Sequence, residues 1–156
     1  MFIRNYRIGE EKALHAVFYS SVRQLGKNHY TAEQLAAWAP DSCAQEAWVR
    51  RIGNTLPFVA EISGQIVGYA DLQVTGYIDH FFVAGAYSRC GVGTALMEHI
   101  HSLARERGIC ELTSDVSLSA EQFFAHHGFS VIERQTPVIN GVTLANSRMH
   151  KKLDAV

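Results

Sequence analysis

The spacing of apolar and polar residues predicts five helical segments: residues 10–25, a short helix beginning at Thr31, a short helix from Ser42 to Gly53, residues 91–107, and residues 117–127. The segment 91–107 has the most regular apolar stripe, and Gly108 follows it where a helix commonly ends. Thr31 and Ser42 each precede a glutamine by three residues, which is the spacing of a capping box. We therefore expect a hydrogen-bonded N-terminus at both short helices.

Apolar runs of strand length predict seven strands: residues 2–7, 56–62, 65–74, 77–83, 109–113, 129–139 and 142–149. Ser63-Gly64 and Asn140-Gly141 are two-residue turn signals that join two pairs of these strands into hairpins. Residues 77–83 are apolar on both faces, as in a strand at the centre of a sheet. The order of elements predicts an α/β fold, a central mixed β-sheet of about seven strands with helices on both faces. No internal repeat or low-complexity stretch divides the chain, so we expect a single domain over residues 1–156.

Composition and charge exclude several classes of function. The net charge of -1 offers no overall positive field for nucleic acid or an anionic membrane. The cysteines, Cys43, Cys90 and Cys110, are odd in number and widely spaced, so neither a disulfide framework nor a CxxC metal site is expected. No apolar run approaches the roughly 18 residues of a membrane helix, and no apolar signal region follows Met1. We expect a cytoplasmic protein.

The candidate chemistry is concentrated where the strand 77–83 gives way to the helix 91–107. Gly91 and Gly93 remove side chains from this loop, just where the N–H groups of the first helical turn have no partner inside the helix. Such N–H groups, at the positive end of the helix dipole, bind phosphate. A dinucleotide fingerprint would need glycine or alanine at Leu96, and a P-loop would need a Gly-Lys-Ser/Thr ending. The dinucleotide-binding fold and the P-loop are therefore excluded. We expect the loop to hold a diphosphate in a fold of another kind.

This segment resembles motif A of the GNAT superfamily of acyl-CoA-dependent N-acetyltransferases. Val83 matches the end of its strand, Gly91 and Gly93 match its glycines, and Leu96 matches the first core residue of its helix. Residues 117–129, Ser-Leu-Ser-Ala-Glu-Gln-Phe-Phe-Ala-His-His-Gly-Phe, resemble the second landmark of the family, usually Asn-x-x-Ala-x-x-Phe-Tyr-x-x-x-Gly-Phe. The two landmarks and the order of elements extend the resemblance over essentially the whole chain.

The resemblance implies acetyl-CoA as co-substrate and no metal. It places along the cofactor the residues Phe82, Val83, Ser88, Arg89, Cys90, Gly91, Val92, Gly93, Thr94, Ser117 and Phe124. Ser88 departs from the usual glutamine or arginine, and Arg89 beside it could substitute. Ser117 departs from an asparagine that contacts the pantetheine arm. Phe124 replaces a tyrosine that often protonates the departing thiolate, which a phenyl ring cannot do.

The resemblance also implies that the cofactor enters between two splayed strands, 77–83 and 109–113, with the thioester carbonyl at a backbone N–H near Val83. Asp79 and His80 lie on the first of these strands and are the candidates for the base that accepts the proton of the amine. Because side chains alternate along a strand, only one of the two can face the cleft. An alternative interpretation is equally open: both are polar groups satisfied inside the sheet.

The acceptor pocket of this family is usually walled by the first helices, and here that region is rich in aromatic residues. Tyr30 and Trp38 could stack on a substrate or cage a cation, although Trp38 could equally anchor the core. Cys90 lies where a thiolate would be stabilised, but the chemistry of the family needs no nucleophile. The histidines lack the spacing of a metal site.

The sequence thus predicts an N-acetyltransferase that moves an acetyl group from acetyl-CoA to an amine of a small molecule or peptide by direct attack. One alternative is a non-catalytic acyl-CoA-binding or sensor module, which the loss of the tyrosine at Phe124 favours. Another is an acyltransferase for a longer acyl group. Neither a nucleic acid nor a membrane is expected as partner. Dimers are common in the family, and the terminal strands could pair across a homodimer.

Overall fold

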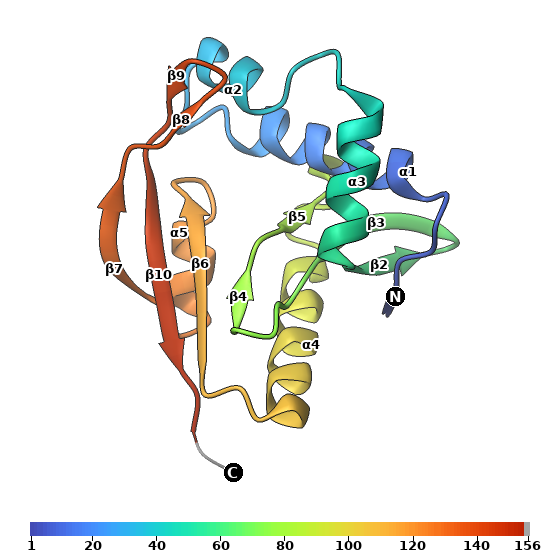
Figure 1. Cartoon of the computed structure of the whole chain (residues 1–156), viewed down its shortest axis with the longest axis vertical. Helices are drawn as coiled ribbons and strands as arrows, with labels where there is room; N and C mark the ends of the chain where they lie inside the picture. The colour runs from blue at the N-terminus through green and yellow to red at the C-terminus, as the bar shows by residue number, and fades with distance from the viewer. Residues whose placement is uncertain (155–156) are drawn as a thin grey trace.

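The computed structural model describes residues 1–154 (Figure 1). Along the chain its elements are β1 (Phe2–Asn5), α1 (Glu11–Ser20), the π-helix η1 (Ser21–Leu25), α2 (Ala32–Trp38), α3 (Gln45–Thr55), β2 (Phe58–Ile62), β3 (Gln65–Ala70), β4 (Tyr77–Ile78), β5 (Phe81–Val83), the short helix η2 (Gly85–Tyr87), α4 (Val92–Arg107), β6 (Glu111–Ser117), α5 (Glu121–His126), β7 (Ser130–Gln135), β8 (Val138–Ile139), β9 (Val142–Thr143) and β10 (Asn146–Lys152). None of the helices described is both long and apolar enough to span a membrane.

The strands form two four-stranded sheets that diverge from each other (Figure 1). The first sheet has the order β1-β2-β3-β5 and the second the order β4-β6-β10-β7, while β8 and β9 make a separate hairpin. Neighbouring strands are antiparallel except β4 and β6, which run parallel. The expected α/β fold with a mixed sheet is confirmed, although its strands divide into two halves.

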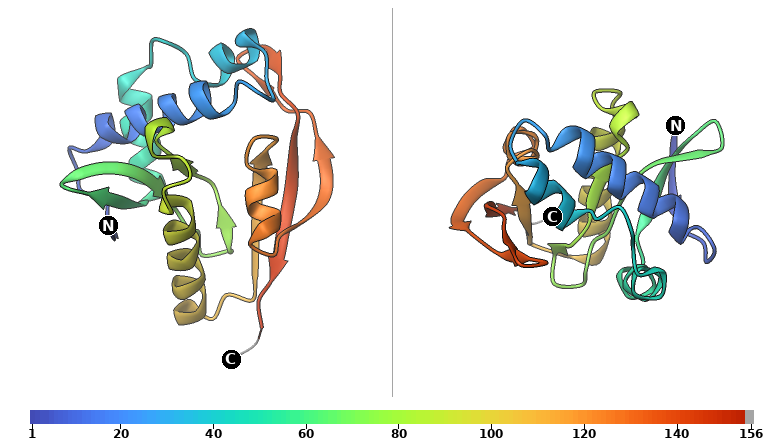
Figure 2. Two further views of the ribbon diagram at one scale, coloured as in Figure 1. Left: turned by 180° about the vertical axis from the view of Figure 1, so that it is seen from behind. Right: turned by 90° about the horizontal axis from the view of Figure 1, so that it is seen from above.

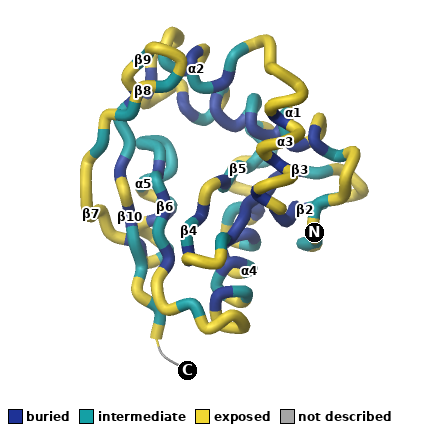
Figure 3. Tube along the Cα trace, in the orientation of Figure 1, coloured by how far each residue is buried: buried dark blue, intermediate teal, exposed yellow. Residues whose placement is uncertain are grey.

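Helices cover both faces of the strands, as expected. One hydrophobic cluster joins α4 and α5 to the strands, and a second joins α1, α2 and α3 to the first sheet. Side chains alternate between the two faces of β2, so this strand contributes to both clusters. Phe58 and Ala60 belong to the first cluster and Val59 to the second. Figure 2 shows α4 and α5 on the side of the strands opposite α3, and Figure 3 shows the buried segments between these layers.

The prediction of one strand over residues 77–83 is wrong. Residues 79–80 interrupt it and separate β4 from β5. The strand expected over 65–74 ends at Ala70, and the strand expected over 109–113 instead runs through Glu111–Ser117. The first two changes have one cause. Asp71 bonds the N–H groups of residues 79 and 80 with its carboxylate, and these groups are then unavailable to a neighbouring strand.

The helix boundaries were predicted in part. The capping box at Thr31 and Gln34 is confirmed by both of its hydrogen bonds. The one at Ser42 is wrong, because α3 begins at Gln45 with Ala44 before it and no side-chain cap. Gly108 ends α4 in the left-handed conformation, as expected. The helix expected over 10–25 becomes π-helical in η1, and the helix expected over 117–127 shortens to α5.

Both strands expected near the C-terminus are interrupted. The residues 129–139 give β7 and β8, and the residues 142–149 fall into β9 and β10. Pro137 offers no N–H to a ladder and lies at the first interruption. The turn between β8 and β9 is confirmed, since Asn140 and Gly141 both have positive φ, 49° and 80°, as a type I′ turn requires.

Candidate active site

A wedge between β5 and β6 is the feature around which the candidate site is built. β4 pairs with β6 through Tyr77 and Ile78 alone, whereas β5 pairs with β3 through Phe81–Val83. The two sheets therefore separate beyond Ile78, and β5 and β6 diverge (Figure 1). The outer edge of β5 and the last residues of β6 face the opening between them.

Asp71, which is completely buried, holds the kink where the wedge begins. Its Oδ1 accepts the N–H of Asp79 at 2.9 Å and that of His80 at 2.7 Å, and its Oδ2 accepts the side-chain amide of Gln73. Burial raises the pKa of Asp71 to about 6, against the opposing effect of these hydrogen bonds. The kink is therefore fixed by a carboxylate that is ionised at neutral pH.

Asp79 and His80 lie in the break between β4 and β5 and differ in burial, although their side chains approach each other. His80 is completely buried, and its Nδ1 lies 3.0 Å from the hydroxyl of Tyr69. Its Nε2 has no hydrogen-bond partner within the described chain and lies 3.6 Å from Oδ2 of Asp79. Burial lowers the pKa of His80 to about 3, so the imidazole is neutral at physiological pH. The side chain of Asp79 is 42% exposed and stands between this imidazole and solvent.

The loop between η2 and α4 exposes a run of backbone donors. Within residues 1–154, no oxygen accepts the N–H groups of Arg89, Cys90, Gly91, Val92, Gly93 and Thr94. Arg89 and Gly91 have positive φ, 60° and 83°, which turns the chain sharply before the helix. A Cβ at Gly93 would lie 3.1 Å from the ring of Phe123 in α5 and 3.8 Å from the side chain of Val83. The loop therefore lies at the mouth of the wedge, between β5 and α5.

The other residues expected along the cofactor divide into surface and core. Phe82, Val83 and Ser117 are half-buried at the wedge, and Ser88 is exposed in the loop. Val92 contributes its N–H to the loop while its side chain is in the core. Phe124 is 2% exposed. Its ring packs against those of Phe81 and Phe129, so the expectation that it faces the cofactor is corrected to a packing role.

Comparisons with known proteins agree with this geometry. The family model described as acetyltransferase (GNAT) domain matches residues 27–153. The chain is 32% identical to the uncharacterized N-acetyltransferase YafP of Escherichia coli over 96% of its own length and 95% of that protein. The chain belongs to the GNAT acetyltransferase family. This membership confirms the expected enzyme class, an acyltransferase.

Solved structures extend the likeness to three dimensions. A GCN5-related N-acetyltransferase from Rhodopseudomonas palustris is 35% identical, with a TM-score of 0.92 over 97% of this chain and 95% of that one. The structure of yncA, a putative acetyltransferase from Salmonella typhimurium with its cofactor acetyl-CoA, is 21% identical, with a TM-score of 0.69 over 100% and 95% of the two chains. The divergent sheets seen here are thus the fold of known GNAT proteins.

Tyr30 has a structural position in this GNAT domain. It is 7% exposed, and its hydroxyl donates to the carbonyl of Ala145 at 2.6 Å and accepts the N–H of Leu118 at 2.9 Å. The expectation that Tyr30 stacks on a substrate is therefore corrected, since its ring is covered. The hydroxyl instead ties the segment before α2 to the end of β6 and the start of β10.

We expect Tyr30→Phe to lower the free energy of unfolding by about 1–3 kcal/mol, because a buried N–H and a buried carbonyl lose their partner. Urea denaturation monitored by circular dichroism measures the change. Tyr87→Phe is the matched control, since that hydroxyl makes an exposed contact to Gln65 at 3.4 Å. Equal stability of the two variants would show that the buried bonds of Tyr30 contribute nothing.

Trp38 lies closer to the predicted acceptor pocket. Its side chain is half-buried, and its ring centroid is 6.2 Å from that of Phe82 on β5 and 5.8 Å from that of Tyr30. Trp48, by contrast, is buried, and its indole N–H donates to the carbonyl of Glu11 at 2.7 Å. Trp38 is therefore the aromatic residue of α2 that adjoins β5, and its role toward a substrate stays a prediction.

Several residues at the site were missed by the sequence analysis. Asp71 and Tyr69 position the Asp79–His80 segment, and Arg51 of α3 lies close enough to lower the pKa of His80. A charged residue inside the apolar run 65–74 was a usable signal for Asp71, whereas Arg51 had none. Among residues 1–154, no group of three His, Cys, Asp or Glu side chains is arranged to hold a metal ion.

Proposed function

We propose that this protein transfers the acetyl group of acetyl-CoA to the amine of a small molecule or peptide by direct attack. The observation that carries the proposal is the joining of two features in one place. The wedge beside β5 opens at the loop of unpartnered N–H groups. Gly93 of this loop lies next to Phe123 of α5 and Val83 of β5. A long cofactor with a diphosphate at one end and a thioester at the other fits this arrangement.

The loop would hold the diphosphate of acetyl-CoA. Three or four of its N–H groups could donate to the phosphate oxygens, at about 1.5–3 kcal/mol for each bond to a charged acceptor. Arg89, which is exposed next to them, adds a guanidinium. Because the same N–H groups lie at the N-terminus of α4, the helix dipole adds to the attraction.

The outer edge of β5 would hold the thioester. On its inner edge, Ala84 donates to the carbonyl of Val67 at 2.8 Å, and Asp71 donates to the carbonyl of His80 at 3.2 Å. In an antiparallel pair, hydrogen-bonded positions alternate with outward-facing ones. The N–H of Val83 therefore faces the wedge, where it would donate to the carbonyl oxygen as negative charge develops there.

The reaction would proceed in one displacement. The amine nitrogen attacks the carbonyl carbon and forms the N–C bond, the C–S bond breaks, and the thiolate of CoA takes the electron pair. The amine must first lose its proton, which at pH 7 requires roughly 4–5 kcal/mol for an amine of pKa about 10.4 and about 1 kcal/mol for an α-amine. Asp79 is the accessible acceptor for this proton, with neutral His80 behind it.

The thiolate would not take its proton from residue 124. Phe124 has no hydroxyl and lies in the core. Nearby tyrosine hydroxyls are already bonded, that of Tyr30 to Ala145 and that of Tyr77 to Asp115. Water is then the source of this proton. The same feature favours the second candidate function, a GNAT domain that binds an acyl-CoA without catalysis.

Two measurements test the proposal. Calorimetry with acetyl-CoA and with longer acyl-CoAs reports binding and ranks the donors. Release of the CoA thiol across a panel of amines reports transfer. We expect binding and transfer with acetyl-CoA; binding without thiol release on any amine would assign the protein to the non-catalytic function, and tighter binding and faster transfer of longer chains would assign it to a different acyl donor.

Asp79→Asn is expected to lower kcat by about 10²–10⁴-fold while the Kd of acetyl-CoA stays within twofold. The amide keeps the shape of the carboxylate but cannot take up a proton from the amine. Initial rates of thiol release and calorimetry measure the two quantities. Asp154→Asn, at an exposed carboxylate beyond β10, is the matched control. An unchanged kcat in Asp79→Asn would remove Asp79 from the mechanism.

A further inference from the structure

A cavity beside the β4–β5 kink carries charges that the acetyl-transfer step does not use. It has a volume of about 420 Å³ and lies between α3 and the strands. The polar residues that line it are Arg50, Arg51, Asn54, Thr55, Gln73 and Asp79. Asp79 is thus shared by this cavity and the candidate catalytic pair. The cavity therefore adjoins the point at which the acceptor amine must lose its proton.

The guanidinium groups of Arg50 and Arg51 have no ion pair or hydrogen bond with any other described residue. Four other arginines, Arg4, Arg23, Arg134 and Arg148, form ion pairs, and Arg148 contacts both carboxylate oxygens of Asp115. Two unpaired guanidinium groups and one carboxylate, that of Asp79, give the cavity an excess of positive charge. An anion is the ligand that balances it.

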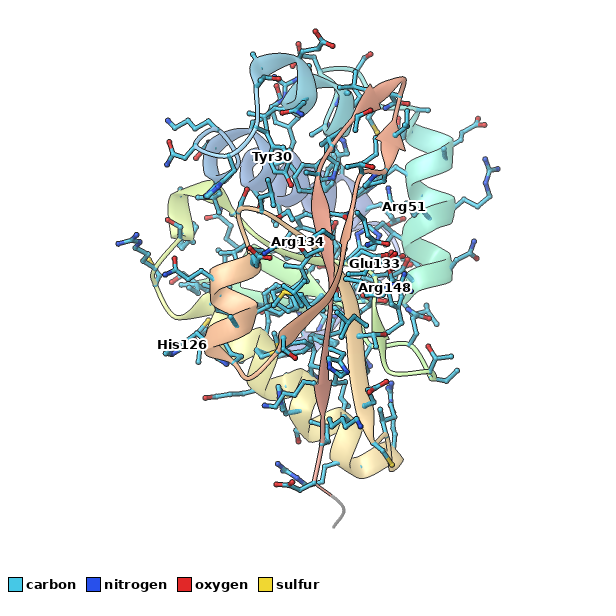
Figure 4. The ribbon with its side chains drawn as sticks, turned by 90° about the vertical axis from the view of Figure 1, so that its left-hand side faces the viewer. Tyr30, Arg51, His126, Glu133, Arg134 and Arg148 are labelled. Carbon is cyan, nitrogen blue, oxygen red and sulfur yellow. The ribbon has the colours of Figure 1, made fainter. Side chains whose placement is uncertain are left out.

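Arg51 is directed toward the strands rather than away from them. Figure 4 labels it on the side of α3 that faces the sheet. Its guanidinium carbon lies 6.0 Å from the centre of the Trp48 ring. Arg51 lines the cavity together with Gln73 and Asp79, so it lies close to the kink. Arg51 therefore reaches the same region as Asp79.

We propose that the acceptor is a small amine that also bears an anionic group, which binds Arg50 and Arg51 while the amine lies at Asp79. This inference rests on the proposed function. Guanidinium groups recognise carboxylates and phosphonates through paired hydrogen bonds, which fixes orientation as well as charge. With the anion held at α3, the amine is directed to the carboxylate of Asp79. An amine without an acidic group would leave both guanidinium groups unneutralised.

The acid group takes no part in bond making. The bonds that form and break are those of acetyl transfer, N–C and C–S, and the proton still leaves the amine toward Asp79. The anion selects and orients the substrate. Its contribution is therefore seen in the ratio of kcat/KM between an acid and its neutral counterpart, with each rate expressed per free-base amine, because the acidic group also changes the pKa of the amine.

The experiment compares matched pairs of acceptors on the protein saturated with acetyl-CoA or CoA. The acids are the L-amino acids and 2-aminoethylphosphonate, and the neutral partners are the amino-acid carboxamides and ethylamine. Calorimetry on the CoA complex gives Kd, and thiol release with acetyl-CoA gives kcat/KM. We expect at least one acid to exceed its neutral partner by ten-fold or more in both quantities.

Variants assign the preference to the two arginines. The double variant Arg50→Gln/Arg51→Gln is expected to reduce the acid-to-neutral ratio to below three, and Arg51→Lys to retain part of it. Arg105→Gln, an exposed arginine on α4, is the matched control and should keep the wild-type ratio. Equal binding of acids and neutral amines by the wild type would overturn the inference, as would a preference that survives in the double variant. An acid preference in binding without thiol release would instead count against acetyl transfer and leave the anion site standing.

Discussion

Gly91→Val and Gly93→Val are each expected to raise the Kd of acetyl-CoA by two to four orders of magnitude. A valine at Gly91 would have to adopt a φ of 83°, and a valine at Gly93 would begin with a Cβ 3.1 Å from the Phe123 ring. Either side chain would displace the N–H donors from the diphosphate. The loss of two bonds to a charged acceptor is worth roughly 3–6 kcal/mol, which corresponds to about 10²–10⁴ in Kd.

Calorimetry with acetyl-CoA measures this change, and circular dichroism shows whether each variant is folded. Gly53→Ala is the matched control, because a Cβ there meets no atom within 4 Å and lies on α3, remote from the loop. A folded Gly91→Val or Gly93→Val protein whose Kd stays within threefold of the wild type would exclude the loop as the diphosphate site.

The second large effect concerns stability at acid pH. The pKa of His80 is lowered from 6.5 to about 3 in the folded protein. A group whose folded pKa is depressed takes up its proton in the unfolded chain first, so stability is lost as the pH falls from 6.5 toward 3. The full difference corresponds to on the order of 5 kcal/mol. His80→Asn, which can still bond the Tyr69 hydroxyl, removes this loss.

The pKa shift of Asp71 has the opposite effect on the free energy of unfolding. Its folded pKa is raised from 3.8 to about 6, so the folded protein takes up this proton first and gains stability as the pH falls from 6 toward 3.8. In the wild type the two groups offset each other over that range. Relative to wild type, His80→Asn should therefore gain stability at about 1.4 kcal/mol per pH unit on acidification, and Asp71→Asn should lose it at a similar rate.

Urea denaturation at pH 6.5, 5.5 and 4.5 measures the free energies of unfolding. Each variant is compared with wild type at the same pH, so that the titration of other carboxylates cancels. Parallel curves for His80→Asn and wild type would show that His80 has the same pKa in the folded and the unfolded protein. Parallel curves for Asp71→Asn and wild type would show the ordinary pKa for that carboxylate.

The sequence predicted the features that depend on local chemistry. Glycines at 91 and 108 indicated the two ends of α4, and both adopt positive φ there. The Asn140-Gly141 turn and the capping box at Thr31 were equally local. The diphosphate loop was predicted from the glycines at the start of a helix, whereas the splayed strands came from the resemblance to known acetyltransferases.

The features that the sequence did not predict depend on contacts between distant segments. The break at residues 79–80 requires the carboxylate of Asp71, eight residues earlier, which appears in the sequence as one polar residue in an apolar run. Phe124 matches a family tyrosine by alignment, yet its ring faces Phe81 and Phe129. The approach of Arg51 to His80 follows from the packing of α3, which no motif encodes.

The short parallel pairing of β4 with β6 has a mechanical consequence. Tyr77 and Ile78 of β4 pair with β6 inside the second sheet, and the chain then passes through residues 79 and 80 to β5 in the first sheet. A molecule bound between β5 and β6 would contact both sheets at once, in addition to the hydrophobic cluster that the sheets already share. Occupancy would then add contacts between β5 and β6, two strands that do not pair with each other.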